Sequence, residues 1–344
     1  MTSEHALVGC LMGTAVGDSV GLPAEGLKPR QIARRMPGPW RHRLLGPWGM
    51  CSDDTDHAFF VAQSLITSQG DVDAFRDRLA WALRGWFLAL PPGLGLGTAR
   101  ACIKLCLGWP SRRAGVWSAG NGPAMRAPMI GAYFHDDAEA RLAHVEASTW
   151  LTHTDPQALV GALAIAEVAA WSRLGSTEPV ADLLTRLRAL PNGDATWREA
   201  MDSVQHALAG ELTVSNLADL LGLSEGITGY MHHTVPMVIY TVLRHREDPC
   251  EGLDQLWRCG GDTDTTGAIA GALFGVEHGP SIWPEAWLTP IKNGPLSLAT
   301  LQRAGEALAR GDDRRVRWWW PLVPVRNLAQ LVVVLGHGFR RLVP

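Results

Sequence analysis

The sequence predicts an all-α fold: a single compact multi-helix domain that spans about residues 1–312. Apolar residues recur at three- and four-residue steps in many segments, and Gly or Pro signals separate these segments. The alternating pattern of strands is nearly absent. The chain has 344 residues, of which 47% are hydrophobic, so it can bury a sizeable core.

The first predicted helix covers the apolar run from Ala6 to Gly17. Glu4 precedes this run, no Lys or Arg occurs before Lys28, and Asp18 follows directly, so we interpret the run as a core helix and not as a signal peptide. A second helix is expected over 52–66, starting at a group of acids. Further helices are expected at 71–90, 157–174, 179–190, 195–210, 213–221 and 235–246. No window approaches the roughly 20 uninterrupted apolar residues that a membrane span needs.

Two of the apolar segments carry glycine at every fourth position. These glycines are Gly9, Gly13, Gly17 and Gly21 in the first segment and Gly267, Gly271 and Gly275 in the second. Each glycine costs a helix about 1 kcal/mol relative to alanine. Repeated glycines on one face therefore indicate close packing against another backbone, and we expect both helices to cross near the functional site.

Composition excludes several classes of protein. The net charge of −3 and the pI near 6.5 give no basic field for nucleic acid. The six cysteines are scattered without a CxxC pair, which argues against a disulfide framework or a zinc ribbon. We therefore expect a cytoplasmic protein, and a monomer.

The tail, residues 313–344, differs in composition from the rest of the chain. From Arg314 onward it has six arginines, no acids and the run Trp318 to Trp320. Apolar residues fall at helical spacing, namely Leu328, Leu331, Val332, Leu335, Phe339 and Leu342. Such an amphipathic helix could make peripheral contact with an anionic membrane. Docking on the core is favoured, since apolar stripes on helices usually mean burial within the protein.

Two distant segments carry carboxylates and hydroxyls at helix starts. The first comprises Ser52, Asp53, Asp54, Thr55 and Asp56, and the second follows two glycines and contains Asp262, Asp264 and Thr265. Either segment alone would be an ordinary helix cap. Brought together, so many acids would be very costly to bury unless cations neutralise them. Hard oxygen donors without His or Cys favour Mg²⁺ or Mn²⁺ over zinc.

Three other features are weaker candidates. Glu25 follows the first glycine helix in a turn and could add a carboxylate, although a solvated loop glutamate is the commoner case. Gly120, Asn121 and Gly122 could form a backbone cradle for phosphate with Arg126 nearby, yet most such triplets are turns. His153 opens another helix, where a structural hydrogen-bonding role is the more common one.

Taken in order, five motifs resemble the ADP-ribosylglycohydrolase family. They are VGDSVGLPAEG, SDDTDHAFFVAQSL, SAGNGPAMRAPMIGAYF, LTHTDPQALVGALA and GGDTDTTGAIAGALFG, within about residues 6–290. The most specific part of the resemblance is the GGDTDT motif together with the distant DDT at residues 53–55.

The resemblance implies an all-α fold around a binuclear site with two Mg²⁺ or Mn²⁺ ions, at which ADP-ribose is released from a protein, nucleic-acid or small-molecule acceptor. The implied metal ligands are Ser52, Asp53, Asp54, Asp262, Asp264 and Thr265. Glu25 corresponds to a gating carboxylate, and Glu25, Asp53 and Asp54 are the catalytic candidates. The implied substrate-binding residues are Gly120, Asn121 and Gly122 for the diphosphate, with Met125 and His153 nearby.

The sequence departs from the family pattern at two places. Ser52 replaces the usual Thr and keeps the hydroxyl. The glycine-rich loop at 92–98 lacks the acid that many members carry, which puts arginine-linked substrates in doubt. Two alternatives remain open: an inactive ADP-ribose-binding or structural protein of the same fold, and a two-metal phosphatase acting on nucleotide diphosphates.

Overall fold

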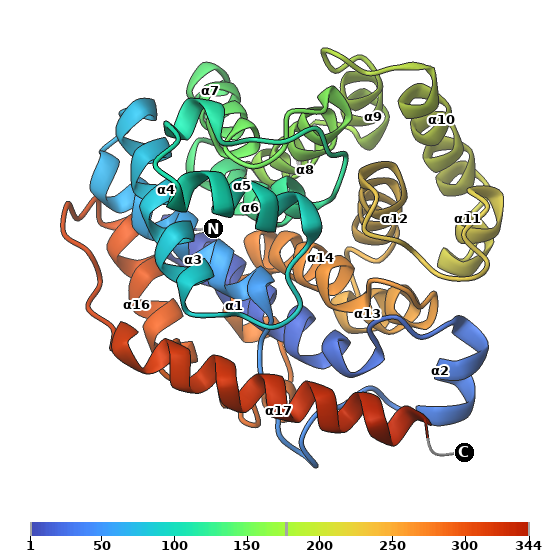
Figure 1. Ribbon diagram of the computed structural model, residues 1–344. Coiled ribbons are helices and arrows are strands. Elements are labelled where there is room, and N and C mark those ends of the chain that lie inside the picture. Colours follow the sequence, from blue (N-terminus) through green and yellow to red (C-terminus); the bar gives the residue numbers. More distant parts are fainter. Residues whose placement is uncertain (1, 176–177, 343–344) are drawn as a thin grey trace.

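Two helices that cross at the centre of the molecule organise the fold. In the computed structural model, which describes residues 2–175 and 178–342, these are α1 (Ser3–Gly21) and α14 (Thr263–His278) (Figure 1). Nearly every residue of both helices is buried. Within the described residues the regular structure is helical, and β-pairing is limited to isolated bridges.

Glycines set the contact between α1 and α14. A Cβ added to Gly9, Gly13 or Gly17 would lie about 2 Å from the carbonyl oxygen of Gly275, Gly271 or Gly267, respectively. The partner numbers fall as the α1 numbers rise, so the helices run antiparallel. The close approach expected from the glycine spacing is therefore confirmed. It places the C-terminal end of α1 beside the N-terminal end of α14.

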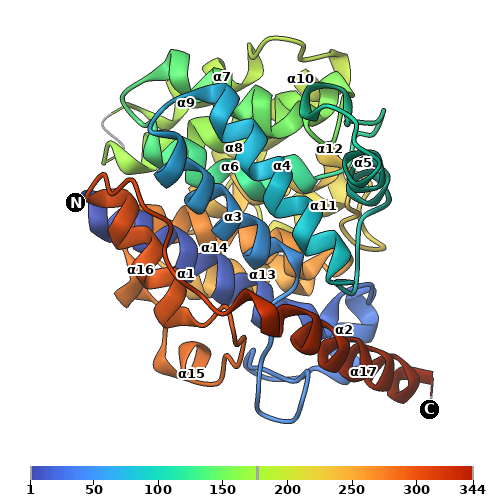
Figure 2. The same cartoon turned by 60° about the vertical axis from the view of Figure 1, so that its left-hand side comes forward.

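The other helices surround this pair. They are α2 (Pro29–Arg35), α3 (Asp53–Ser68), α4 (Val72–Leu88), α5 (Leu96–Cys106), α6 (Gly122–Tyr133), α7 (Ala138–Trp150), α8 (Pro156–Arg173), α9 (Val180–Arg188), α10 (Ala195–Ala209), α11 (Val214–Leu220), α12 (Met231–Arg244), α13 (Pro249–Arg258), α15 (Glu285–Leu288), α16 (Leu298–Ala309) and α17 (Val323–Leu342). Helices α3, α6 and α16 pack on α1, and α6, α8, α12 and α13 pack on α14. Figure 2 shows α3 and α4 in front of this central pair.

The predicted all-α class is confirmed, and the predicted helices occur with small shifts at their ends. The first helix is longer than expected, because it starts at Ser3 and continues to Gly21. Helix α12 starts at Met231 rather than at 235, since it accommodates Pro236 internally. The expected loop at 92–98 is partly helical, because α5 begins at Leu96. All six cysteines lie in the described ranges as free thiols.

One helix in the described part is long and apolar enough to cross a membrane by length and composition. It covers Ser3–Ala24, and its apolar stretch is entirely buried inside the protein. The burial fits the role of a core helix that its flanking charges predicted.

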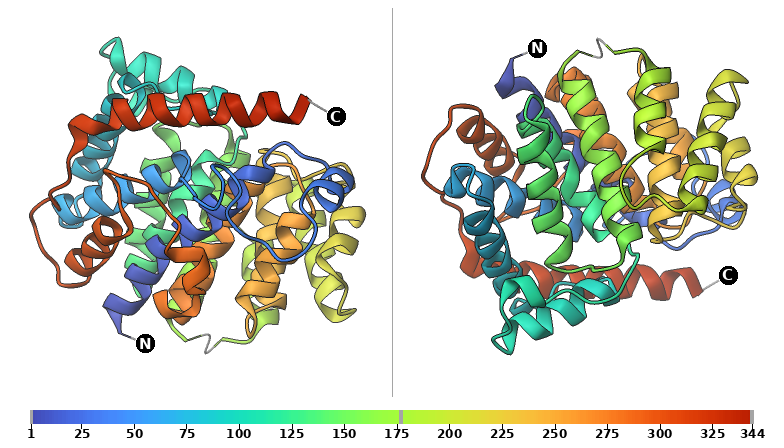
Figure 3. Two further views of the ribbon diagram at one scale, coloured as in Figure 1. Left: turned by 90° about the horizontal axis from the view of Figure 1, so that it is seen from below. Right: turned by 90° about the horizontal axis from the view of Figure 1, so that it is seen from above.

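Helix α17 lies along one side of the molecule, from the side of α16 to the side of α2 (Figures 1 and 3). Val323 at its start is buried, and the other buried side chains among its described residues are polar. Arg326 pairs with Asp56, with Nη1 2.7 Å from Oδ1, and both side chains are buried. Asn327 donates to the Ala89 carbonyl at 2.8 Å. The helix is therefore docked by its polar face.

The expectation that the apolar stripe of this tail is buried was wrong for the residues that the structure describes. Leu328, Leu331, Val332 and Leu335 are exposed. The polar side chains take the inward positions because they find buried partners there. The side chains of Phe339 and Leu342, which belong to the same predicted stripe, lie outside the described part of the structure.

We expect Gly13→Ala to lower the free energy of unfolding by about 1–3 kcal/mol or more, because the new methyl group has no room against the α14 backbone. Gly85→Ala is the matched control. Gly85 also lies inside a helix, but its added Cβ would meet no atom within 4 Å, so this change should be neutral or slightly stabilising. Urea denaturation measures both. Equal stability of the two variants would contradict the close contact.

We expect Arg326→Ala to destabilise the protein by roughly 3–5 kcal/mol, because it leaves the buried Asp56 carboxylate without its cation. Arg188→Ala removes an exposed pair with Asp202 and should cost at most about 1 kcal/mol. Thermal and denaturant unfolding compare the two. Similar small losses would show that the Arg326 contact does not hold α17 in place.

Candidate active site

Three helix ends meet where α1 and α14 cross. They are the C-terminal end of α1 and the N-terminal ends of α3 and α14. Thr263 Oγ1 donates to the Gly21 carbonyl at 2.8 Å, which fixes the start of α14 against the end of α1. Helix N-termini carry unpaired N–H groups and a partial positive charge, so this junction favours anionic groups.

Asp18, buried in α1, positions the start of α3. Its two carboxylate oxygens each accept from the Ser52 amide at 2.9 Å, and Oδ2 also accepts from the amide and hydroxyl of Thr55 at 3.2 and 2.5 Å. Burial raises the Asp18 pKa to about 7, although these donors act in the opposite direction. Asp18 therefore adds a buried carboxylate directly beneath the acidic segment.

The structure brings the two predicted acidic segments into direct contact. Ser52 Oγ donates to Asp54 Oδ2 at 3.0 Å, and Thr265 Oγ1 donates to the same oxygen at 3.1 Å across 211 positions of sequence. Asp54 is fully buried and Asp264 nearly so. Residues from both segments therefore form one buried polar cluster.

The turn before α14 depends on its two glycines. Gly260 and Gly261 have positive φ angles of 70° and 81°, and a Cβ on Gly261 would lie 1.9 Å from the Ile227 carbonyl oxygen. Gly26 donates to the Gly261 carbonyl at 2.7 Å, so the turn after α1 is tied to this one. The pairing holds exposed Glu25 at the edge of the buried acids.

The carboxylates repel one another strongly. The pKa of Asp53 is raised well above its usual value by burial and then by Asp18, with a smaller contribution from Glu25. Burial and the neighbouring carboxylates also raise the pKa values of Asp54 and Asp264. The cluster therefore favours anything that brings in positive charge.

The cluster leaves acceptor atoms unused. Asp54 Oδ1 and Asp264 Oδ1 are buried and accept no hydrogen bond from the described residues. In the same part of the chain, no three His, Cys, Asp or Glu side chains already stand in an arrangement that could hold a metal ion. The donor type, the excess negative charge and the unused lone pairs nevertheless fit a hard divalent cation.

The GNG segment lies against the second acidic segment. Asn121 Nδ2 donates to Asp262 Oδ2 at 2.6 Å and to Thr234 Oγ1 at 3.0 Å. Two of the three amides in the expected cradle already have partners, because Gly120 donates to Ser118 Oγ and Asn121 to the Gly229 carbonyl. The Asn121 side chain thus orients Asp262, a contact that the sequence did not indicate.

His153 lies next to the same segment and is almost fully buried. Burial, followed by the charge of Arg126, lowers its pKa to about 3, so the ring is neutral near pH 7. Arg126 donates to Thr152 Oγ1 at 2.7 Å, and that hydroxyl lies 2.8 Å from His153 Nδ1. The Thr152 hydroxyl therefore links the guanidinium of Arg126 to the imidazole of His153 and fixes the position of the ring.

Glycines make room for this imidazole. An added Cβ would lie 2.8 Å from His153 Nε2 at Gly97 and 3.2 Å from it at Gly120, and 3.2 Å from Cε1 at Gly122. The glycine-rich segment that lacks an acid therefore packs against the same imidazole as the GNG segment. Arg126 is fully buried, with Nη1 unpaired among the described residues.

Asp18 and the partner of Asp56 were missed by sequence reasoning. A carboxylate inside the otherwise apolar, glycine-rich α1 was the available signal for Asp18, because a buried unpaired acid is costly. Asp56 belonged to the predicted acidic segment, but it binds Arg326 and accepts from Trp86 Nε1 at 3.2 Å. Asp56 therefore has a structural role at the start of α3.

Comparison with known proteins agrees with this geometry. A sequence model described as ADP-ribosylglycohydrolase matches residues 1–316. The chain belongs to this family. The resemblance found in its motifs is confirmed, and membership indicates a hydrolase of the glycosidase type.

Individual relatives cover most of the chain. An uncharacterized protein of Archaeoglobus fulgidus is 31% identical over 84% of this chain and 92% of that protein. The ADP-ribosyl-[dinitrogen reductase] glycohydrolase of Rhodospirillum rubrum is 27% identical over 83% of this chain and 89% of that protein. A solved ADP-ribosylglycohydrolase-related protein complex shares the fold, with a TM-score of 0.63 and 24% identity over 90% of this chain and 99% of that one.

The raised carboxylate pKa values predict a pH effect on stability when a chelator is present. The folded state binds more protons than the unfolded chain above the usual aspartate pKa of about 4, so stability from these groups is present at low pH and is lost as the pH rises. We expect Asp54→Asn to reduce the loss of stability between about pH 5 and pH 8 by roughly 1 kcal/mol or more.

Urea denaturation at the two pH values measures this effect. Asp182→Asn, on the exposed surface of α9, is the matched control and should leave the pH dependence unchanged. If Asp54→Asn left the pH dependence unaltered, burial and repulsion would not raise the carboxylate pKa values of the cluster in the folded state.

Proposed function

We propose that the protein is a metal-dependent ADP-ribosyl hydrolase that cleaves the glycosidic bond at C1 of the distal ribose and releases ADP-ribose. The observation that carries the proposal is the buried contact between Thr265 Oγ1 and Asp54 Oδ2, which joins the two acidic segments. Family membership supports the reaction type.

The proposed metal ligands come from both segments. They are Ser52, Asp53, Asp54, Asp262, Asp264 and Thr265. Two bound Mg²⁺ or Mn²⁺ ions would supply Lewis-acid chemistry and orient the ribose hydroxyls. The unused oxygens of Asp54 and Asp264 and the raised pKa values around them support this assignment. Asn121 would hold Asp262 in a fixed orientation through its 2.6 Å hydrogen bond.

The carboxylates would also assist bond cleavage. A water oxygen bonds to C1, the bond from C1 to the acceptor breaks, and one water proton passes to a carboxylate, which returns a proton to the departing acceptor so that the site regains its starting protonation state. Glu25, Asp53 and Asp54 are the candidates for this proton transfer. Glu25 is exposed and close enough to raise the pKa of Asp53, as expected for a group at the mouth of the site. Negative charge around C1 would stabilise the positive charge that develops there.

The second part of the site would hold the rest of ADP-ribose. Gly120, Asn121 and Gly122 would lie along the diphosphate, with Met125 and His153 beside it. Nε2 of neutral His153 lies against Gly97 and Gly120, and in the tautomer with its proton on Nε2 the ring would donate to the substrate there. A neutral donor suits a phosphate oxygen without placing a second full charge beside Arg126.

The decisive experiment incubates the protein and Mg²⁺ with ADP-ribosylated arginine, ADP-ribosylated serine and ADP-ribosylated nucleic-acid ends, and identifies the products by mass. We expect free ADP-ribose and the intact acceptor. AMP together with a ribose phosphate would instead indicate a phosphatase. Binding of ADP-ribose without any product would indicate an inactive relative.

Matched variants test the site in the same assay. Asp53→Asn and Asp262→Asn remove one charge each with little change of shape and should lower turnover roughly 100-fold or more, because each charge is needed for electrostatic stabilisation of the reaction. Both should also weaken Mg²⁺ binding in calorimetry. Asp182→Asn should leave turnover and Mg²⁺ binding unchanged. Full activity in either site variant would refute the assignment.

A further inference from the structure

Helix α17 docks with the opposite polarity from a usual surface helix. Its inward positions carry Arg326, Asn327 and Gln330, each of which is buried and bonded to the core. Gln330 donates to the Cys51 carbonyl at 2.8 Å, directly before Ser52. A helix that buries its polar face leaves its apolar face to the outside.

The outer face of α17 is continuous and apolar. Val325, Leu328, Val332 and Leu335 are 63%, 65%, 64% and 52% exposed. Single exposed leucines are common on protein surfaces, but a stripe of this length along one helix marks an interaction surface. The family match ends at residue 316, so this stripe lies beyond the region that the family shares.

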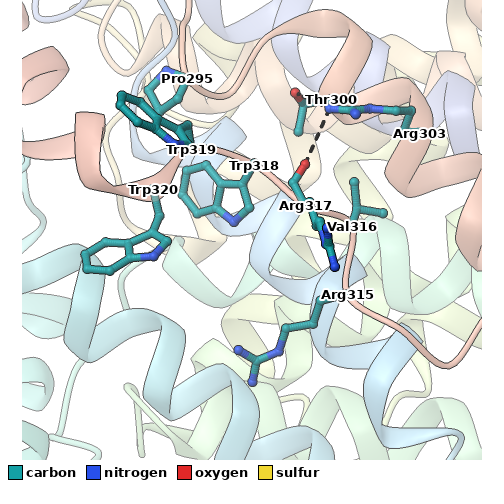
Figure 4. Close-up of a pocket in the computed structure, with 9 residues that line it drawn as sticks. All are labelled: Pro295, Thr300, Arg303, Arg315, Val316, Arg317, Trp318, Trp319 and Trp320. Carbon is teal, nitrogen blue, oxygen red and sulfur yellow. Dashed lines mark hydrogen bonds between the residues drawn. The ribbon is translucent and has the colours of Figure 1, made fainter.

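Tryptophan and arginine flank the start of the stripe. Trp318 packs edge-on against Phe59, with centroids 5.3 Å apart, whereas Trp319 and Trp320 are each 66% exposed. Together these tryptophans line a pocket of about 630 Å³. Figure 4 shows their indole rings on one side of this pocket and the side chains of Arg303, Arg315 and Arg317 on the other.

The charge of this region is one-sided. Residues 314–344 contain six arginines and no acidic residue, although the whole chain has a net charge of −3. Arg314, Arg315 and Arg317 are exposed. Arg326 is the exception, since Asp56 neutralises it inside the protein. The surface therefore combines apolar side chains, exposed indoles and the exposed positive charge of Arg314, Arg315 and Arg317.

We propose that the outer face of α17, together with Trp319, Trp320 and the neighbouring arginines, binds the surface of an anionic lipid bilayer. An apolar stripe can enter the boundary between headgroups and acyl chains, where indole rings are also favoured. The arginines interact with anionic headgroups, and stable peripheral binding generally needs two such contributions.

Charge favours a bilayer over a second copy of the chain. The same face of a second copy would offer no acidic group from residues 314–344 to the exposed arginines, whereas an anionic bilayer supplies negative charge. The polar inner face also keeps α17 attached to the core through buried contacts at Arg326 and Gln330. The helix can therefore present its apolar side to lipid without leaving the protein.

Vesicle co-sedimentation of the full-length chain tests the proposal. The probes are vesicles of phosphatidylcholine alone and vesicles in which phosphatidylglycerol replaces part of it. We expect binding to the anionic vesicles and at least about tenfold weaker binding to the neutral ones, because the arginines contribute through anionic headgroups. High salt should weaken the binding.

Two sets of variants separate the contributions. Leu328→Ser with Val332→Ser removes part of the apolar stripe, and Arg315→Gln with Arg317→Gln removes two charges. The affinity of each double variant for anionic vesicles should fall by about tenfold or more, because the variant loses one of the two contributions. Leu220→Ser is the matched control, since Leu220 is similarly exposed at 55% but lies on α11, away from α17 (Figure 1). Circular dichroism checks that all variants remain helical.

Several results would overturn the proposal. They are absence of binding to anionic vesicles, equal binding to neutral vesicles, or unchanged binding by both double variants. Light scattering tests whether a second copy of the chain binds this face instead. A concentration-dependent dimer that is lost in Leu328→Ser with Val332→Ser, in a protein that does not bind vesicles, would show that this face joins two chains. Turnover of the variants on soluble substrate should remain unchanged, because the substituted side chains face away from the acidic cluster.

Discussion

The contact between α1 and α14 is the constraint on which the other features depend. Carbonyl oxygens of one helix occupy positions where the other would carry Cβ atoms, so only glycine permits this separation. The antiparallel direction then puts Asp18 of α1 next to the start of α14. Because Asp18 also accepts hydrogen bonds from the first turn of α3, the same contact fixes both acidic segments. A wider crossing would separate the donors and acceptors that join them.

This arrangement concentrates negative charge in a buried place, which folding alone does not favour. Hydroxyl donors from Ser52, Thr55 and Thr265 and the N-terminal ends of two helices offset part of the repulsion. The offset is incomplete, because Asp54 and Asp264 each keep an unpaired oxygen within the described part of the chain. Any cation that binds the folded state would therefore stabilise it by mass action. Stability and ligand binding are coupled at this site.

Sequence reasoning predicted the glycine contact and the meeting of the acidic segments, because each pattern destabilises the fold unless a specific arrangement offsets it. Repeated glycines weaken a helix unless another backbone packs closely against them, and grouped acids are costly to bury unless positive charge neutralises them. It did not predict the partner of Asp18, since a single acid in an apolar helix indicates burial but not which amides it meets. The GNG triplet indicated a turn, yet its Asn121 side chain serves Asp262, and that pairing depends on how α6 and α14 pack. The lowered pKa of His153 likewise depends on burial of the ring and then on the charge of Arg126, both of which arise only in the folded chain.

The orientation of α17 shows why helical periodicity alone cannot decide which face is buried. Its apolar and polar residues both recur at helical spacing, so the pattern is compatible with either face turned inward. The contact that decides the orientation is with Asp56, a buried carboxylate 270 positions away in the sequence. Without Arg326 to neutralise this carboxylate, the folded protein would be several kcal/mol less stable. Asn327 and Gln330 meet the Ala89 and Cys51 carbonyls one turn apart, which adds two buried hydrogen bonds to the same face. Exposing a few aliphatic side chains costs about 25 cal/mol per Å² of apolar surface, which these polar contacts can offset.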